Sequence, residues 1–340
     1  LATLSWYFLA KWLKKDKIKD LLFFTVITVI SFYSFYLSVF ILISQWLFLI
    51  FFHKKKLKPF FVSNLAFVIC CLPWLPTFLG QLKGGGYLTS ALPGWAALSG
   101  NLSPKSLMLI PTKFSLGRIS IDPQNLYYLV IGLVTAFISL LFILTLRVKR
   151  SRLFLFWLFI PLGLAILVSI ITPILGYWRY IFLLPAFTTL LAIGISYLPP
   201  KMFNVNVSLV ILLFLSSNLY FLSNPRFHRE NWSTLAELVT QKQDTLLLVN
   251  FTDAFAPLKF YLPDTNVFPT QLKLGQTRQD IDEKLPELIG KDTTIYYLDY
   301  LSDLTSPERP ILTWLKRAGL KKQAVYQFTG LGAVYEYQAP

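Results

Sequence analysis

The sequence has 340 residues, of which 55% are apolar and only 14% are charged, and its mean hydropathy is +0.56. This balance excludes an ordinary soluble protein and indicates a polytopic membrane protein. The net charge of +15 is unevenly spread: residues 1–222 carry 19 basic and 3 acidic residues, and residues 223–340 carry 13 and 14. Because the basic excess lies between apolar runs, membrane topology accounts for it, and we expect no nucleic-acid partner.

The chain opens with an apolar stretch, Leu1–Ala10, that resembles the end of a membrane helix, so we expect a C-terminal part of a longer protein. A basic loop follows, and then an apolar run, Leu21–Phe52. One helix of that length would be about 48 Å long, against about 30 Å of hydrocarbon. We therefore predict two helices with a turn near Ser31–Tyr36.

Further apolar runs complete a predicted set of seven transmembrane helices after one partial helix, in a transmembrane domain over residues 1–222. They are Pro59–Gly80, Leu126–Leu146, Leu153–Thr172, Tyr180–Leu198 and Val205–Leu222. Between two of them, Lys83–Asn125 is predicted to be a long loop. Asp122 and Pro123 are expected to start the next helix, with Asp122 as its N-cap.

Basic residues fix the predicted orientation. The loops on one side hold 14 Lys and Arg, and the longer segments on the other side of this half hold five. The positive-inside rule places the basic side in the cytoplasm. We therefore expect a multi-pass protein of the cell membrane, with Arg179 and everything after Leu222 outside the cytoplasm.

Residues 223–340 have the composition of a soluble domain. Strands are predicted at Thr245–Asn250 and Thr293–Tyr300, and a hairpin near the C-terminus. Thr234 and Glu237 fit a capping box that opens a helix. Alternating strands and helices predict a small extracytoplasmic α/β domain after the helical membrane domain.

The candidate site is a polar-aromatic turn, Gly176–Pro185, with one arginine at its centre. Arg179 can bind a phosphate in bidentate fashion, or it can anchor the chain at the interface beside tyrosine and tryptophan. Arg118, in the predicted loop, is a second candidate, or a solvated loop charge. Acidic residues are scarce in the membrane half, so an enzyme acting outside the cytoplasm would have its carboxylate base upstream of Leu1 or in the soluble domain.

Several short motifs resemble the GT-C superfamily of polytopic glycosyltransferases, of the bacterial protein-mannosyltransferase and aminoarabinose-transferase type (families 39 and 83). They are Phe32–Tyr36 at the helix turn, Leu72–Pro76, Phe114–Arg118, Trp178–Tyr180 followed by Leu184–Pro185, and Asn231–Trp232. Phe35 stands where relatives often have a histidine. Trp178–Tyr180 is the motif most similar to the family's pattern.

The resemblance implies transfer of a sugar from a polyprenyl-phosphate donor to an extracytoplasmic lipid, glycan or protein acceptor, with Arg179, Tyr180 and Arg118 contacting the donor phosphate. It implies an Asp base, which we expect upstream, and a divalent metal is possible. One alternative is a transporter or flippase for lipid-linked sugars, which would have polar residues at mid-membrane. Another is a non-catalytic membrane anchor for a binding domain.

Overall fold

A computed structural model describes residues 1–340 except positions 93, 253–256, 263–265, 274–275, 291 and 339–340. The chain divides into two compact units. The membrane unit comprises Leu1–Gln81 and Ala97–Tyr220, and the α/β unit comprises Leu82–Ala96 and Phe221–Pro340. Each unit is described by itself.

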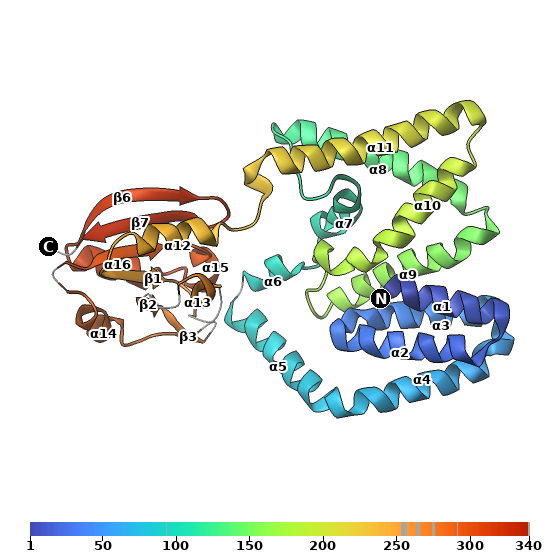
Figure 1. Ribbon diagram of the computed structural model, residues 1–340, viewed down its shortest axis with the longest axis horizontal. Coiled ribbons are helices and arrows are strands. Elements are labelled where there is room, and N and C mark those ends of the chain that lie inside the picture. The colour runs from blue at the N-terminus through green and yellow to red at the C-terminus, as the bar shows by residue number, and fades with distance from the viewer. Residues whose placement is uncertain (93, 253–256, 263–265, 274–275, 291, 339–340) are drawn as a thin grey trace. The chain divides into compact units, whose positions relative to one another are not determined.

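The membrane unit consists of apolar helices packed around an aromatic core (Figure 1). In chain order the helices of residues 1–223 are α1 (Ala2–Lys15), α2 (Ile18–Ser34), α3 (Val39–Phe52), α4 (Leu57–Cys71), α5 (Leu75–Ala91), α6 (Trp95–Ser99), α7 (Pro104–Leu116), α8 (Gln124–Thr145), α9 (Arg152–Ser169), α10 (Leu184–Ser196) and α11 (Pro200–Ser223). The division between the two units falls within α5, α6 and α11, so Leu82–Ala96 and the end of α11 belong to the α/β unit. A 3₁₀ helix, η5 (Tyr177–Leu183), precedes α10. Within the core, Trp6 stacks on Trp157 and Phe60 packs against Phe24.

Five helical stretches among the described residues are long and apolar enough to cross a membrane: Lys54–Ala91, Gln124–Thr145, Lys149–Ser169, Tyr177–Ser196 and Pro200–Ser223. The chain is therefore a mainly helical protein with several membrane-length segments. The predicted turn within 21–52 is confirmed, because α2 ends at Ser34 and the short η1 (Tyr36–Ser38) precedes α3. These two helices are about 26 and 21 Å long, so their crossing of the membrane stays a prediction.

The prediction of a long loop over residues 83–125 is wrong. Helix α5 continues to Ala91 through three glycines, and α6 and α7 follow. The pair Ser103–Pro104 could have predicted the start of α7. In the structure the Ser103 hydroxyl accepts a hydrogen bond from the Ser106 amide at 3.1 Å. Serine at the N-cap and proline at the first helical position are a frequent helix start.

Three basic segments of the membrane unit lie at one end of it. Lys56 lies over the Trp12 ring and forms an ion pair with Asp16, and Arg152 lies over the Phe52 ring. These contacts join the α1–α2 connection, the α3–α4 connection and the start of α9. The sequence pattern predicted one common side for these segments, and the side on which this end lies in a cell stays a prediction.

The α/β unit is a five-stranded sheet between two helical layers. The strand order is β2-β1-β5-β7-β6, with β1, β2 and β5 parallel and β7 antiparallel to both of its neighbours. The strands are β1 (Thr245–Val249), β2 (Asn266–Pro269), β5 (Thr294–Leu298), β6 (Lys321–Phe328) and β7 (Gly332–Gln338); β3 (Gln271–Lys273) and β4 (Gln276–Thr277) form a separate pair.

Both faces of the central strands are covered, which explains why β1 and β5 are uniformly apolar rather than alternating. Helices α12 (Trp232–Thr240) and α13 (Leu258–Tyr261) pack on one face. Helices α14 (Ile281–Glu287) and α16 (Pro310–Arg317) pack on the other, and the short α15 (Ser302–Thr305) follows β5. The predicted small α/β layer structure is present.

Two predicted helix caps are wrong. Pro123, not Asp122, is the N-cap of α8, and Pro123 makes no side-chain capping hydrogen bond. Helix α12 starts earlier than the capping box implied, because the Asn231 side chain accepts from the Thr234 amide at 3.3 Å. Asparagine is as good an N-cap as serine or threonine, so two overlapping cap patterns compete at this start.

Candidate functional site

The turn that holds Arg179 is fixed by backbone pairing with a distant segment. The Leu175 amide donates to the Gly100 carbonyl at 2.8 Å, and the Gly176 amide donates to the Ser99 carbonyl at 3.2 Å. Gly100 has φ of +92°, and a β-carbon there would lie 2.1 Å from the Gly176 nitrogen. A glycine is therefore required at position 100 for both its conformation and the close approach of the chains.

Arg179 ties this turn together. Its Nη1 donates to the Ser99 carbonyl and to the Pro173 carbonyl, each at 3.1 Å. Its Nε and Nη2 make no hydrogen bond with any residue that the structure describes, and the side chain is only partly buried. One edge of the guanidinium is thus held by two carbonyls, while the other edge keeps the donors that a phosphate oxygen accepts.

Tyr180 lies beneath the turn. The side chain is fully buried, and its hydroxyl donates to the Ile174 carbonyl at 2.9 Å. In this structure Tyr180 therefore supports the backbone that carries Arg179. Its predicted contact with a phosphate stays a prediction, and such a contact would require the ring to leave this position.

Arg118 lies just after the C-terminal end of α7, the helix that packs against η5. It is exposed and has no hydrogen bond or ion pair with the described residues. The neighbouring Lys113 Nζ donates to the Ile119 carbonyl at 2.9 Å and to the Tyr127 hydroxyl at 3.3 Å. Burial, together with the charge of Arg118, lowers the pKa of the Lys113 ammonium. The structure thus adds Lys113 to the cations predicted near this turn.

An apolar cavity opens among the helices that carry these cations. It measures about 390 Å³ and lies between α7, α8, α9 and α10. Phe114, Phe142 and Phe187 contact one another in its wall, and the hydroxyls of Ser115, Thr135 and Ser139 also line it. The cavity begins one residue from Lys113 on α7, and α10 follows directly on η5.

The Phe32–Tyr36 motif at the α2–α3 turn contacts the Leu72–Pro76 motif. The Trp74 indole donates to the Tyr36 hydroxyl at 2.7 Å, and that hydroxyl donates to Gln81 Oε1 at 2.6 Å. Phe35 packs on Phe182 of η5, with ring centroids 5.9 Å apart. The position where a histidine was expected is therefore beside the Arg179 turn, but here it carries a ring that cannot exchange a proton.

Acid–base chemistry has few candidates in the membrane unit. Asp16 and Asp20 belong to the basic end, where Asp20 is buried and paired with Lys11 at 3.0 Å. Asp122, between α7 and α8, is exposed. Among the residues that the structure describes, no three acidic, histidine or cysteine side chains gather where they could hold a metal ion.

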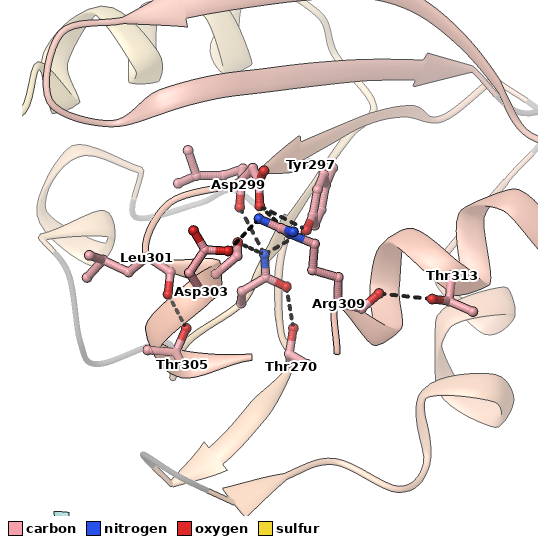
Figure 2. Close-up of polar contacts among 11 residues, drawn as sticks. Thr270, Tyr297, Asp299, Leu301, Asp303, Thr305, Arg309 and Thr313 are labelled. Carbon is pink, nitrogen blue, oxygen red and sulfur yellow. Dashed lines mark hydrogen bonds and ion pairs between the residues drawn. The ribbon is translucent and has the colours of Figure 1, made fainter. Parts of the chain in front are cut away.

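The α/β unit holds a polar network at the carboxyl ends of β1 and β5 (Figure 2). Asn250 Nδ2 donates to the Tyr297 hydroxyl at 2.8 Å and to Ser302 Oγ at 2.6 Å. Arg309 bridges Asp299 at 3.3 Å and Asp303 at 2.8 Å. Burial raises the pKa of the Tyr297 hydroxyl to about 12, so it stays protonated.

This network was not predicted as a site. The usable signal is that Asn250 and Asp299 directly follow two parallel strands, whose carboxyl ends meet at one edge. In the sheet, β2 lies on one side of β1 and β5 lies on the other, so the order in which strands are added changes direction at β1. Ligands bind at such switch points in many open α/β sheets. Here, however, the polar groups partner one another. The network therefore fixes the edge of the sheet and carries no ligand proposal.

Comparison with family models, with curated proteins and with solved structures found no match to this chain.

Proposed function

We propose that this chain belongs to a membrane glycosyltransferase that takes a sugar from a polyprenyl-phosphate donor and transfers it to an acceptor outside the cytoplasm. The motifs around Phe32–Tyr36 and Trp178–Tyr180 resemble those of GT-C enzymes, and the chain has several membrane-length helices. The observation that carries the proposal is that α7, which packs against η5 and carries Lys113, also lines an apolar cavity. A lipid phosphate has an anionic group that cations can bind and an apolar tail that such a cavity can hold.

The charged part of this arrangement is Arg179, with Lys113 on the neighbouring α7 and Arg118 just after that helix. During transfer an acceptor hydroxyl oxygen attacks the anomeric carbon, and the bond from that carbon to the phosphate oxygen breaks. The bonding electrons leave with the phosphate, which gains negative charge, and the acceptor proton passes to a carboxylate. A guanidinium already held by two carbonyls stabilises that charge without reorganising.

The apolar part is the cavity between α7 and α10. Its volume of about 390 Å³ and its phenylalanine walls suit several isoprene units of a lipid tail. Burial of such a tail supplies binding energy, and the cations orient the phosphate. A free nucleotide-sugar has no part that would use this cavity, so we favour a lipid-linked donor.

The test is binding of a short-chain polyprenyl phosphate to the purified chain in neutral detergent. Arg179→Gln should weaken binding by about 10- to 100-fold, the usual value of a charge-assisted pair. The polyprenol without phosphate should bind the native chain weakly and be insensitive to the change.

Arg147→Gln is the matched control, because Arg147 is an exposed arginine of the basic end. It should leave binding unchanged. If Arg179→Gln binds the phosphate as tightly as the native chain does, Arg179 is not the phosphate ligand. If the native chain does not distinguish phosphate from alcohol, the donor proposal fails.

A further inference from the structure

The basic end of the membrane unit contains an amphipathic hollow. It measures about 480 Å³ and is lined by Phe51, Phe52, His53 and the three lysines Lys54–Lys56. Phe51 and Phe52 end α3, and the other four residues connect it to α4. The hollow has no part in the function proposed above, which uses the helix ends around Arg179.

Phe51 and Phe52 give the hollow an aromatic side, and both rings pack against Phe156 of α9. The Phe156 ring of α9 lies 5.9 Å from Phe51 and 5.5 Å from Phe52, measured between ring centroids. The Ser44 hydroxyl of α3 donates to the Phe156 carbonyl at 2.7 Å, which fixes the two helices together. Phe51 is 66% exposed, so an apolar surface is presented beside the charged loop.

The rim of the hollow is cationic and largely uncompensated. Arg152 of α9 lies over the Phe52 ring at 5.1 Å and brings a fourth cation to the lysines. Lys56 pairs with Asp16 at 2.5 Å. Lys54, Lys55 and Arg152 have no ion-pair partner within the described chain. Three cations without an ion-pair partner beside an exposed ring are complementary to a partner that is anionic at one end and apolar at the other.

We propose that this groove is a binding site for an anionic phospholipid of the adjacent leaflet, with its phosphate on Lys54, Lys55 and Arg152 and the start of an acyl chain on Phe51. The positive-inside rule alone accounts for basic loops but not for their convergence on an aromatic hollow. A polybasic cluster at a membrane surface gains about 1 kcal/mol per cation from anionic lipid. An ion such as free phosphate would use the cations but leave the ring unused.

The experiment titrates short-chain phosphatidylglycerol into the full chain, purified in neutral detergent with phosphatidylcholine, and counts bound lipids by native mass spectrometry. The groove variant is Lys54→Gln/Lys55→Gln/Arg152→Gln. The charge-matched control is Lys14→Gln/Lys17→Gln/Lys19→Gln, which changes exposed lysines of the other basic loop. The groove variant should lose about 5-fold in affinity per cation, or about 100-fold in all, and the control should bind like the native chain.

Two further measurements separate a lipid from a phosphate and guard against misfolding. Glycerol phosphate should compete poorly with the lipid. Phe51→Ser keeps every charge and should weaken lipid binding several-fold even if the triple variant does not fold. Equal losses of lipid affinity in the groove variant and in the control would overturn the proposal. The lipid would then be attracted by the total positive charge of this end and not by the groove. Effective competition by glycerol phosphate would overturn it too, because the site would then recognise phosphate alone.

Discussion

Gly100→Ala perturbs the Arg179 turn without changing any side chain that a ligand could contact. The new β-carbon would lie 2.1 Å from the Gly176 nitrogen, and the backbone at φ of +92° disfavours alanine. Since backbone atoms cannot move aside as a flexible side chain can, the two segments must separate. The separation would break both backbone hydrogen bonds between them and the bond from Arg179 to the Ser99 carbonyl.

The expected cost follows from these losses. Backbone strain at such an angle costs about 1–3 kcal/mol, and the lost hydrogen bonds, one of them to a charged group, cost a few more, about 4–8 kcal/mol together. The assay is hydrogen–deuterium exchange, read on peptides that contain the amides of Leu175 and Gly176. Even the lower value corresponds to about 1000-fold faster exchange of these amides.

Gly117→Ala is the matched control, because Gly117 also has positive φ, +66°, but a β-carbon there would have nothing within 4 Å of it. It should carry the strain without the separation, so exchange at Leu175 and Gly176 should not change. If Gly100→Ala leaves these amides as protected as in the native chain, the segments adapt to a side chain. The close approach would then not be what positions Arg179.

Two predictions concern the α/β unit. Asn250→Ala removes the two short buried hydrogen bonds to Tyr297 and Ser302, together with longer ones to Leu298 and Thr270. It should cost about 2–4 kcal/mol, seen as faster exchange in β1 and β5, whereas the exposed Asn266→Ala should have little effect. Burial raises the pKa of the Glu336 carboxyl, but hydrogen bonds from Lys242 and Tyr326 outweigh it and lower the pKa overall. The resulting stabilisation is complete above the ordinary glutamate pKa of about 4.3 and is lost as pH falls through the lower folded value. Glu336→Gln should therefore reduce the acid sensitivity of this unit in pH-dependent exchange, and equal sensitivity in both proteins would contradict the argument.

Local patterns in the sequence predicted those elements whose structure depends mainly on their own residues. Apolar runs longer than a bilayer predicted the break between α2 and α3, and uniformly apolar segments predicted β1 and β5. Prediction failed where neighbouring signals compete. The three glycines of Gly84–Gly86 indicated a loop, yet they lie inside α5.

The contacts of the site could not be predicted from local patterns. Ser99 is 80 residues from Arg179, and Asn250 is 47 residues from Tyr297. Nothing in either segment specifies the other, because such pairs depend on how whole elements pack. The sequence therefore identified Arg179 as a candidate but not the two carbonyls that hold it. It named Arg118 but not Lys113 as a site residue, because nothing near Lys113 in the sequence indicates the Ile119 carbonyl and the Tyr127 hydroxyl that its ammonium contacts.

The two interpretations of Arg179 that the sequence left open predict different results for a lysine at this position. An interfacial anchor needs only a long side chain with a charged tip, and lysine serves as well as arginine. Arg179 Nη1 donates to the Ser99 and Pro173 carbonyls, which leaves Nε and Nη2 available for a phosphate. A lysine has one ammonium group, so it cannot bind the two carbonyls and a phosphate in the same way. Arg179→Lys should therefore weaken polyprenyl-phosphate binding nearly as much as Arg179→Gln, although the positive charge remains. Native-like binding by Arg179→Lys would favour the anchor, since charge alone would then suffice.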